Sequence, residues 1–203
     1  MKTLILGGVR SGKSRLAESL AQQSGLPVCY IATATAGDEE MRRRVESHRA
    51  RRPADWSVIE EPLALAGALQ KHSASGRCLV VDCLTLWLTN LLMTDAGVGW
   101  AEARSPTNSN GMNHLCWGSP GSPQPTTTTF AHETKAFLAA LPELQGTIIL
   151  VSNETGLGVM PLGELTRRFV DEAGHLHRTL AQTCDRVVLT VAGLPIYLKG
   201  ESP

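Results

Sequence analysis

Eight residues near the start of the chain have the types and the spacing of a phosphate-binding loop. They fit the pattern G-x-x-x-x-G-K-[ST] and are Gly7, Gly8, Val9, Arg10, Ser11, Gly12, Lys13 and Ser14. Glycines allow a tight turn whose backbone N–H groups face phosphate oxygens. Lys13 adds a positive charge for the outer phosphates, and the hydroxyl of Ser14 is a ligand for Mg²⁺. The segment therefore predicts binding of a purine nucleoside triphosphate.

A metal ion bound to phosphates also needs a carboxylate from the protein, and Asp82 is the candidate. It follows the apolar run at residues 78–81, which has the pattern of a buried strand. Phosphate-loop enzymes take their carboxylate ligand for Mg²⁺ from such a residue. The alternative is a strand-end aspartate that caps the next helix. Beside a phosphate loop, the metal role is the favoured interpretation.

The loop needs a strand before it and a helix after it, and the sequence provides both. Residues 4–6 are apolar and stop at two glycines, and residues 14–23 have a helical composition. Further strands are expected at 28–32, 78–81, 147–151, 186–191 and 195–198, and further helices at 38–51, 62–72, 84–93, 130–141 and 162–183. This alternation predicts an α/β fold of the P-loop NTPase type, with a mostly parallel sheet and helices on both faces.

Composition limits the classes of protein to which the chain can belong. Its 203 residues suit a single domain over 1–203. Lys+Arg and Asp+Glu both number 19, and a net charge of zero argues against a nucleic-acid binder. No apolar run reaches the roughly 18 residues of a membrane span. The five cysteines form no C-x-x-C pair, which is typical of reduced thiols and predicts a cytoplasmic protein.

One segment, at about 96–129, differs in composition from the rest of the chain. Its later part, residues 105–129, is rich in Ser, Pro, Gly, Asn and Thr and has no periodicity. Such a segment has too few apolar residues to form a core of its own. We expect it to be a flexible surface insertion within the domain.

The predicted helix at 38–51 carries a histidine with two interpretations. Met41, Val45 and His48 are spaced i, i+4 and i+7, so they share one helical stripe. His48 is therefore either a buried core histidine or a nucleophile toward phosphorus, because neutral imidazole is available near neutral pH. The arginines of the same segment form either a solvated face paired with glutamates or a surface for phosphates. They are Arg42, Arg43, Arg44, Arg49 and Arg51.

Other polar residues have weaker patterns. Glu60 and Glu61 precede Pro62 and are either ordinary helix-start acids or acceptors for a base or ribose. Residues 153–158 follow an expected strand, where α/β sheets place ligands, and form either a substrate loop or a simple turn. His175 and His177 are two residues apart and cannot share a helix face as a metal pair would. The spacing of the other residues shows neither a Ser-His-Asp pattern nor a Cys/His metal site.

Several of these segments, taken in chain order, carry a resemblance to a known family. They are the phosphate loop and residues 30–34, 38–41, 48, 52–53, 56, 60–62, 81–85 and 151–158. The ordered set resembles the bifunctional adenosylcobinamide kinase / adenosylcobinamide-phosphate guanylyltransferase family of cobalamin assembly. The likeness covers residues 1 to about 95 and 130 to 200. The segment at about 96–129 is longer than the family pattern and touches none of its motifs.

The resemblance implies two reactions on small-molecule substrates. A nucleoside triphosphate, ATP or GTP, first phosphorylates the aminopropanol hydroxyl of adenosylcobinamide with Mg²⁺ as the cofactor. GTP then donates GMP to a histidine, and the phosphorylated corrinoid takes this GMP to give adenosylcobinamide-GDP. His48 occupies the position of the family's nucleophile. The resemblance also implies a homotrimer.

The same resemblance implies a set of nucleotide-binding residues. Besides the phosphate loop, these are Thr33, Ala34, Thr35, Arg49, Ala50, Arg51, Glu60 and Asp82. Ser14 and Asp82 are the expected ligands of Mg²⁺. Two alternatives remain open on the sequence alone. One is a small-molecule kinase without guanylyltransferase activity, and the other is a non-catalytic nucleotide-binding module.

Overall fold

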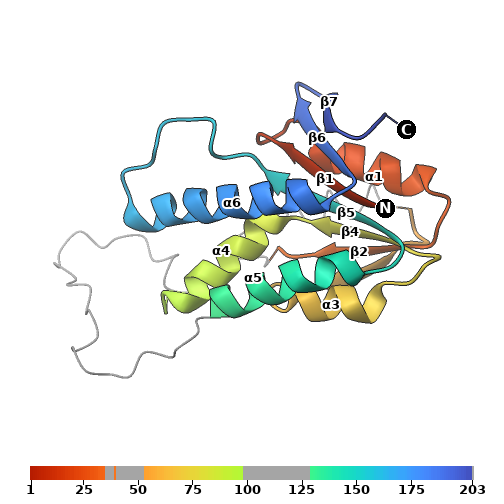
Figure 1. Cartoon of the computed structure of the whole chain (residues 1–203), viewed down its shortest axis with the longest axis horizontal. Helices are drawn as coiled ribbons and strands as arrows, with labels where there is room; N and C mark the ends of the chain where they lie inside the picture. Colours follow the sequence, from red (N-terminus) through yellow and green to blue (C-terminus); the bar gives the residue numbers. More distant parts are fainter. Residues whose placement is uncertain (35–38, 40–52, 98–128, 203) are drawn as a thin grey trace.

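The computed structural model describes residues 1–34, 39, 53–97 and 129–202, which form one seven-stranded sheet with helices (Figure 1). The strands are β1 (Lys2–Gly7), β2 (Val28–Ala32), β3 (Ser57–Glu60), β4 (Cys78–Asp82), β5 (Thr147–Asn153), β6 (Arg186–Val191) and β7 (Leu194–Lys199). The helices are α1 (Lys13–Gln23), α3 (Leu65–His72), α4 (Leu84–Asp95), α5 (Thr129–Ala140) and α6 (Glu164–Thr183), with a 3₁₀ turn, η2 (Leu141–Glu143).

The strand order is β3-β2-β4-β5-β1-β6-β7, and every neighbouring pair is parallel except β6 and β7. The expected mostly parallel sheet is therefore confirmed. Parallel neighbours end at the same edge of a sheet, so the residues after β1, β2, β4 and β5 meet there. The phosphate loop follows β1, which lies between β5 and β6.

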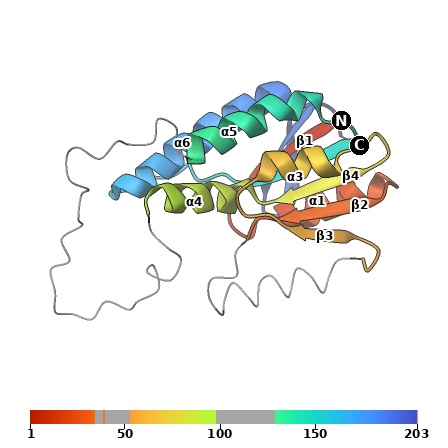
Figure 2. The same ribbon diagram turned by 90° about the horizontal axis from the view of Figure 1, so that it is seen from below.

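Helices cover both faces of the sheet, as the sequence predicts. Helix α1 packs on one face against alternate strand residues such as Tyr30, Val80 and Val151. Helices α3, α4, α5 and α6 cover the other face, where Ile31, Val81 and other apolar side chains form the larger core (Figure 2). Strands buried on both sides explain the continuous apolar runs in the sequence.

Two elements depart from the expectations. The sequence analysis did not anticipate β3, because this edge strand is mostly exposed and lacks a long apolar run. The helix expected from Pro62 begins at Leu65 instead. The carboxylate of Glu61 accepts hydrogen bonds from the N–H groups of Leu63 and Ala64, at 3.0 and 2.8 Å, and holds this segment in a turn.

Some expectations fall outside the described residues. These are the helix at 38–51, apart from Glu39, and the insertion at about 96–129, apart from its ends. The described chain resumes at α5 with Thr129, where the insertion was expected to end. The single-domain organisation over 1–203 stays a prediction. Within the described residues, no helix is long and apolar enough to cross a membrane.

Candidate functional site

The phosphate loop lies between β1 and α1, at the edge where the parallel strands end. Three of its residues have a positive φ: Gly7 with 155°, Arg10 with 57° and Gly12 with 99°. A left-handed conformation costs a non-glycine residue free energy, and glycine adopts it without that cost. Gly12 is the N-cap of α1, and its carbonyl accepts the hydrogen bond of Leu16 N–H at 3.0 Å. The first turn of α1 therefore points its N–H groups toward the loop.

Lys13 is buried inside the loop. Its side chain is 7% exposed, and its Nζ donates a hydrogen bond to the carbonyl of Gly8 at 2.7 Å. Burial lowers the pKa of Lys13, and the nearby Cys83 and Asp82 oppose this shift. A bound triphosphate would give the ammonium group anionic partners in place of a neutral carbonyl. The loop thus already places the one charge that its motif requires.

Asp82 lies at the carboxyl end of β4, on the face covered by α1. Period-2 alternation puts its side chain on the same face as Val80, which packs against α1. The hydroxyl of Tyr30 donates to Asp82 Oδ2 at 2.6 Å and fixes the carboxylate. Ser14, the other expected ligand, is half-buried in the first turn of α1. A carboxylate and a hydroxyl on one face of the sheet suit a hard cation such as Mg²⁺.

Thr33 and Ala34 follow β2, beside the end of β4. The hydroxyl of Thr33 donates to the carbonyl of Cys83 at 2.7 Å and accepts from the N–H of Cys83 at 2.9 Å. The carbonyl of Thr33 accepts from Asn90 Nδ2 at 2.9 Å. Thr33 is fully buried, so its hydroxyl serves to join β2 to β4. Ala34, the next residue, is half-buried.

The remaining predicted residues divide into two groups. Glu60 is exposed at the end of β3, paired in register with Ala32 of β2. It therefore lies at the same edge as Asp82, two strands away. The second group lies outside the described residues and comprises Thr35, His48, Arg49, Ala50 and Arg51. Their roles stay predictions.

The structure shows a polar cluster at the end of β5 that the sequence analysis did not predict. His177 of α6 lies with its Nε2 2.7 Å from Ser152 Oγ and its Nδ1 3.6 Å from Glu154 Oε2. Thr85 of α4 completes the cluster, with its hydroxyl 3.3 Å from that of Ser152. Burial lowers the pKa of His177, and Glu154 partly offsets this shift. The cluster brings Ser152 and Glu154, two residues apart at the end of β5, together with Thr85 and His177, which are distant in sequence.

This cluster is bonded directly to the phosphate loop. The N–H of Glu154 donates to the carbonyl of Gly7 at 3.0 Å, and Asn153 pairs with Gly7 in the β1–β5 register. Glu154 Oε1 accepts from the N–H of Gly156 at 2.8 Å. The glutamate side chain is 22% exposed, whereas the side chain of His177 is 7% exposed. A carboxylate beside the phosphate loop is thus held by its own turn and lies next to a buried imidazole.

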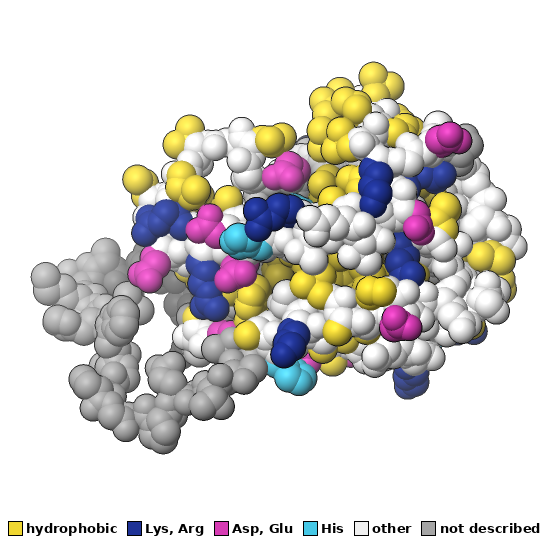
Figure 3. All heavy atoms as spheres, in the orientation of Figure 1, with side chains coloured by type: hydrophobic (Ala, Val, Ile, Leu, Met, Phe, Trp, Pro, Cys, Tyr) yellow, Lys and Arg dark blue, Asp and Glu magenta, His cyan; other side chains and the backbone are white. Residues whose placement is uncertain are grey.

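The β6–β7 hairpin supports the loop from the other side. Gly193, at the hairpin turn, donates its N–H to the carbonyl of Ser11 at 2.9 Å. A Cβ on Gly12 would lie 3.3 Å from the Cα of Gly193. Beyond this turn, exposed apolar side chains of the hairpin form the patch visible where Figure 1 labels β7 (Figure 3). They are Val191, Leu194, Ile196 and Leu198.

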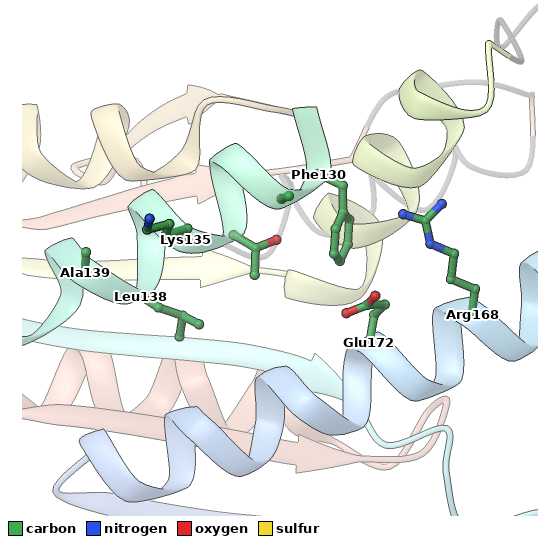
Figure 4. A pocket seen from close by; sticks show the side chains of 8 residues that line it. Phe130, Lys135, Leu138, Ala139, Arg168 and Glu172 are labelled. Atoms are coloured by element: carbon green, nitrogen blue, oxygen red, sulfur yellow. The ribbon is translucent and has the colours of Figure 1, made fainter. Parts of the chain in front are cut away.

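An open groove between α5 and α6 lies on the face of the sheet opposite α1 (Figure 4). Phe130, Lys135 and Leu138 line its α5 side, and Arg168 and Glu172 line its α6 side. The guanidinium of Arg168 lies 5.6 Å from the centroid of the Phe130 ring. Because the phosphate loop leads into α1, this groove is separate from the candidate nucleotide site.

Comparison with known proteins agrees with this arrangement. A protein 57% identical, the "Bifunctional adenosylcobalamin biosynthesis protein CobP" of Pseudomonas aeruginosa, aligns over 99% of both chains. The "Bifunctional adenosylcobalamin biosynthesis protein CobU" of Escherichia coli is 32% identical over 98% of this chain and 100% of its own. The protein of that name in Salmonella typhimurium is 32% identical over the same shares.

The family model described as "Cobinamide kinase / cobinamide phosphate guanyltransferase" matches residues 3–198. That range includes the phosphate loop, Asp82 and the cluster around His177. With nearly the whole chain matched, this protein belongs to the cobinamide kinase / cobinamide phosphate guanyltransferase family.

Proposed function

We propose that this protein phosphorylates adenosylcobinamide with a nucleoside triphosphate and then transfers GMP from GTP to the product, giving adenosylcobinamide-GDP. The observation that carries the proposal is the phosphate loop. Lys13 is buried within it, and Asp82 is fixed by Tyr30 on the face that α1 covers. Membership of the family supplies the substrate class. The nucleotide-binding set named above is part of the proposal.

In the phosphorylation step, the loop N–H groups and Lys13 bind the phosphates of ATP or GTP. Lys13 exchanges its hydrogen bond to the carbonyl of Gly8 for hydrogen bonds to phosphate oxygens, so it can stabilise the negative charge that develops on them. Ser14 and Asp82 would hold Mg²⁺, which supplies neutralisation of the phosphate charge when bound. The acceptor hydroxyl attacks the γ-phosphorus, and the nucleoside diphosphate leaves.

In the guanylylation step, His48 acts as the nucleophile. Its imidazole nitrogen attacks the α-phosphorus of GTP, and pyrophosphate leaves with the electron pair of the broken bond. A phosphate oxygen of the phosphorylated corrinoid then displaces the histidine from GMP. The covalent intermediate divides one difficult transfer into two easier ones. The resemblance of the segment around His48 to the family supports this role.

The intermediate gives a direct test. Purified protein is incubated with α-³²P-GTP and Mg²⁺, denatured, and separated by gel electrophoresis. We expect an acid-labile, base-stable label on the wild-type protein and on His132→Ala, whose histidine is exposed on α5, and none on His48→Ala. Label retained by His48→Ala would exclude this nucleophile. An unlabelled wild-type protein that still binds nucleotide would leave a kinase or a nucleotide-binding module.

Two further parts of the proposal concern the protein as a whole. We propose a homotrimer, and the exposed apolar side chains of the β6–β7 hairpin give a surface that association could bury. Sedimentation equilibrium measures the mass that distinguishes a trimer from a monomer. We also place the activity in the cytoplasm, because the described cysteines Cys29, Cys78, Cys83 and Cys184 are all free thiols.

A further inference from the structure

Glu154 follows β5 directly beside the phosphate loop. Its backbone is bonded to Gly7, the first residue of the phosphate loop, and its side chain is partly open to solvent. Asp82 belongs to the expected metal site and is engaged by Tyr30. Glu60 lies on β3, and three strands separate β3 from β1. Of these three described carboxylates, Glu154 is therefore the one best placed for proton transfer beside the loop.

The buried cluster behind Glu154 has a hydrogen-bond direction that can be deduced. The N–H of Asn153 donates to Thr85 Oγ1 at 2.6 Å. Thr85 can then donate to Ser152 Oγ, and Ser152 can donate to His177 Nε2. In this arrangement each hydroxyl accepts one hydrogen bond and donates one. A neutral imidazole that accepts at Nε2 carries its proton on Nδ1.

The opposite tautomer would be unfavourable. It would leave a bare Nδ1 lone pair 3.6 Å from the negative Oε2 of Glu154. Nδ1 is buried and has no hydrogen-bond partner among the described residues, so an N–H there has the carboxylate as its nearby acceptor. The distance of 3.6 Å between Nδ1 and Oε2 is longer than a hydrogen bond. It would shorten when a substrate binds beside the carboxylate.

A serine nucleophile is excluded by burial, although Ser152, His177 and Glu154 have the residue types of an acyl-transfer triad. Ser152 is 1% exposed, and its hydroxyl lies between His177 and Thr85. A substrate carbonyl therefore cannot reach Oγ. The glutamate is partly exposed, at 22%, and this directs the chemistry to its carboxylate.

The loop that follows Glu154 has exposed apolar side chains that a large substrate could contact. Leu157, Val159 and Leu162 are 83, 97 and 96% exposed, and they stand between the glutamate and α6. Contiguous exposed apolar side chains next to a site commonly mark a binding surface. An acceptor with an apolar body and a hydroxyl arm would contact this loop and bring its oxygen to Glu154.

We propose that Glu154 is the general base for the phosphorylation step and that His177 is the positioning residue that orients its carboxylate. The inference rests on the proposed function. As the bond from the acceptor oxygen to the γ-phosphorus forms, the hydroxyl proton moves to Glu154. The bond from the γ-phosphorus to the bridging oxygen breaks, and its electron pair leaves with the nucleoside diphosphate. Glu154 then releases the proton to solvent, and His177 stays neutral throughout.

The role of the base is tested with Glu154→Gln, which keeps the size of the side chain and removes the basic oxygen. Phosphorylation of adenosylcobinamide by γ-³²P-ATP or γ-³²P-GTP is measured under saturating substrate. We expect kcat to fall by about 10²–10⁴-fold, with little change in KM for the triphosphate. A fall of less than about threefold would overturn the assignment, since general-base catalysis contributes far more than that.

The role of His177 is tested with two variants, each of which replaces only one of the two ring nitrogens. In His177→Asn the amide NH₂ occupies the place of Nδ1 and can still donate to Glu154. In His177→Gln the amide oxygen occupies the place of Nε2 and still accepts from Ser152. We expect His177→Gln to lower kcat by roughly 10–100-fold and His177→Asn to lower it less. A merely structural histidine would give equal kcat values, because each variant loses one of the two contacts.

Controls separate this inference from the function on which it rests. His175, exposed two residues away on α6, is changed to Asn and to Gln, and neither variant should alter kcat. ¹⁵N NMR of the wild-type protein should show the Nδ1–H tautomer for His177, independently of any turnover. The Nε2–H tautomer would overturn the positioning role. A wild-type protein that phosphorylates no cobinamide would refute the proposed function, whereas active wild-type and active Glu154→Gln proteins would refute this inference alone.

Discussion

Replacing Tyr30 with phenylalanine removes the hydroxyl that donates to Asp82 Oδ2 at 2.6 Å. The rest of the contact remains, because the ring still stacks on Trp56 at a centroid distance of 6.4 Å. A hydrogen bond to a charged group contributes about 1.5–3 kcal/mol. For a chain of this size, 1 kcal/mol corresponds to roughly 2–4 °C in Tm. We therefore expect Tyr30→Phe to lower Tm by about 3–12 °C.

Thermal unfolding followed by circular dichroism measures the change in Tm, and urea unfolding measures the loss of about 1.5–3 kcal/mol, both without nucleotide or Mg²⁺. The matched control is Tyr197→Phe, in the chain's other tyrosine, which is half-buried on β7. We expect this control to change the free energy of unfolding by less than about 0.5 kcal/mol. A loss of the same small size in Tyr30→Phe would refute the reasoning, because it would mean that water replaces the tyrosine at Asp82 without cost.

Three other perturbations have defined outcomes. Gly12→Ala should lower the free energy of unfolding by about 1–3 kcal/mol and weaken nucleotide binding measured by calorimetry, because φ of Gly12 is 99° and the new Cβ meets Gly193. The control Gly174→Ala adds a Cβ in open space on α6 and should not destabilise the protein. Lys199→Met should cost about 0.5–2 kcal/mol in urea unfolding, because Nζ donates to three carbonyls at the end of α6. Because the pKa of His177 is lowered in the folded protein, His177 is protonated more readily in the unfolded chain as pH falls below about 6.5. Unfolding free energy should therefore decline from about pH 7 to pH 5 more steeply in the wild-type protein than in His177→Asn, and equal slopes would contradict the burial argument.

Local patterns predicted most of the fold, because buried parallel strands carry their pattern in the chain itself. The strands expected at 28–32 and 186–191 have those bounds in the structure, and Gly12 begins α1 as the motif requires. The edge strand β3 was missed for the corresponding reason. An edge strand with three exposed residues in four is stabilised by pairing with β2, and that pairing leaves no apolar run in the sequence.

The candidate site was predictable where its chemistry is local. The phosphate loop is one continuous motif, and Asp82 is marked by the strand that it ends. The cluster around His177 was not predictable, because its members come from α4, β5 and α6 and meet only in the folded chain. Spacing along α6 gave the neighbouring histidines no distinct roles. The fold separates them, since His177 is buried and His175 is exposed.

The pairing of β1 also affects when the protein can fold relative to its synthesis. A ribosome synthesises β1 first, yet its two neighbours are β5 and β6, and the hairpin turn that supports its loop comes at Gly193. At 5–20 residues per second, the first strand waits roughly 10–40 s for these partners. During that interval the nascent chain exposes Leu4, Ile5 and Leu6, which are buried in the finished sheet. The nucleotide site should therefore fold only after the hairpin has been synthesised, and a chaperone bound to the nascent β1 segment should favour that folding.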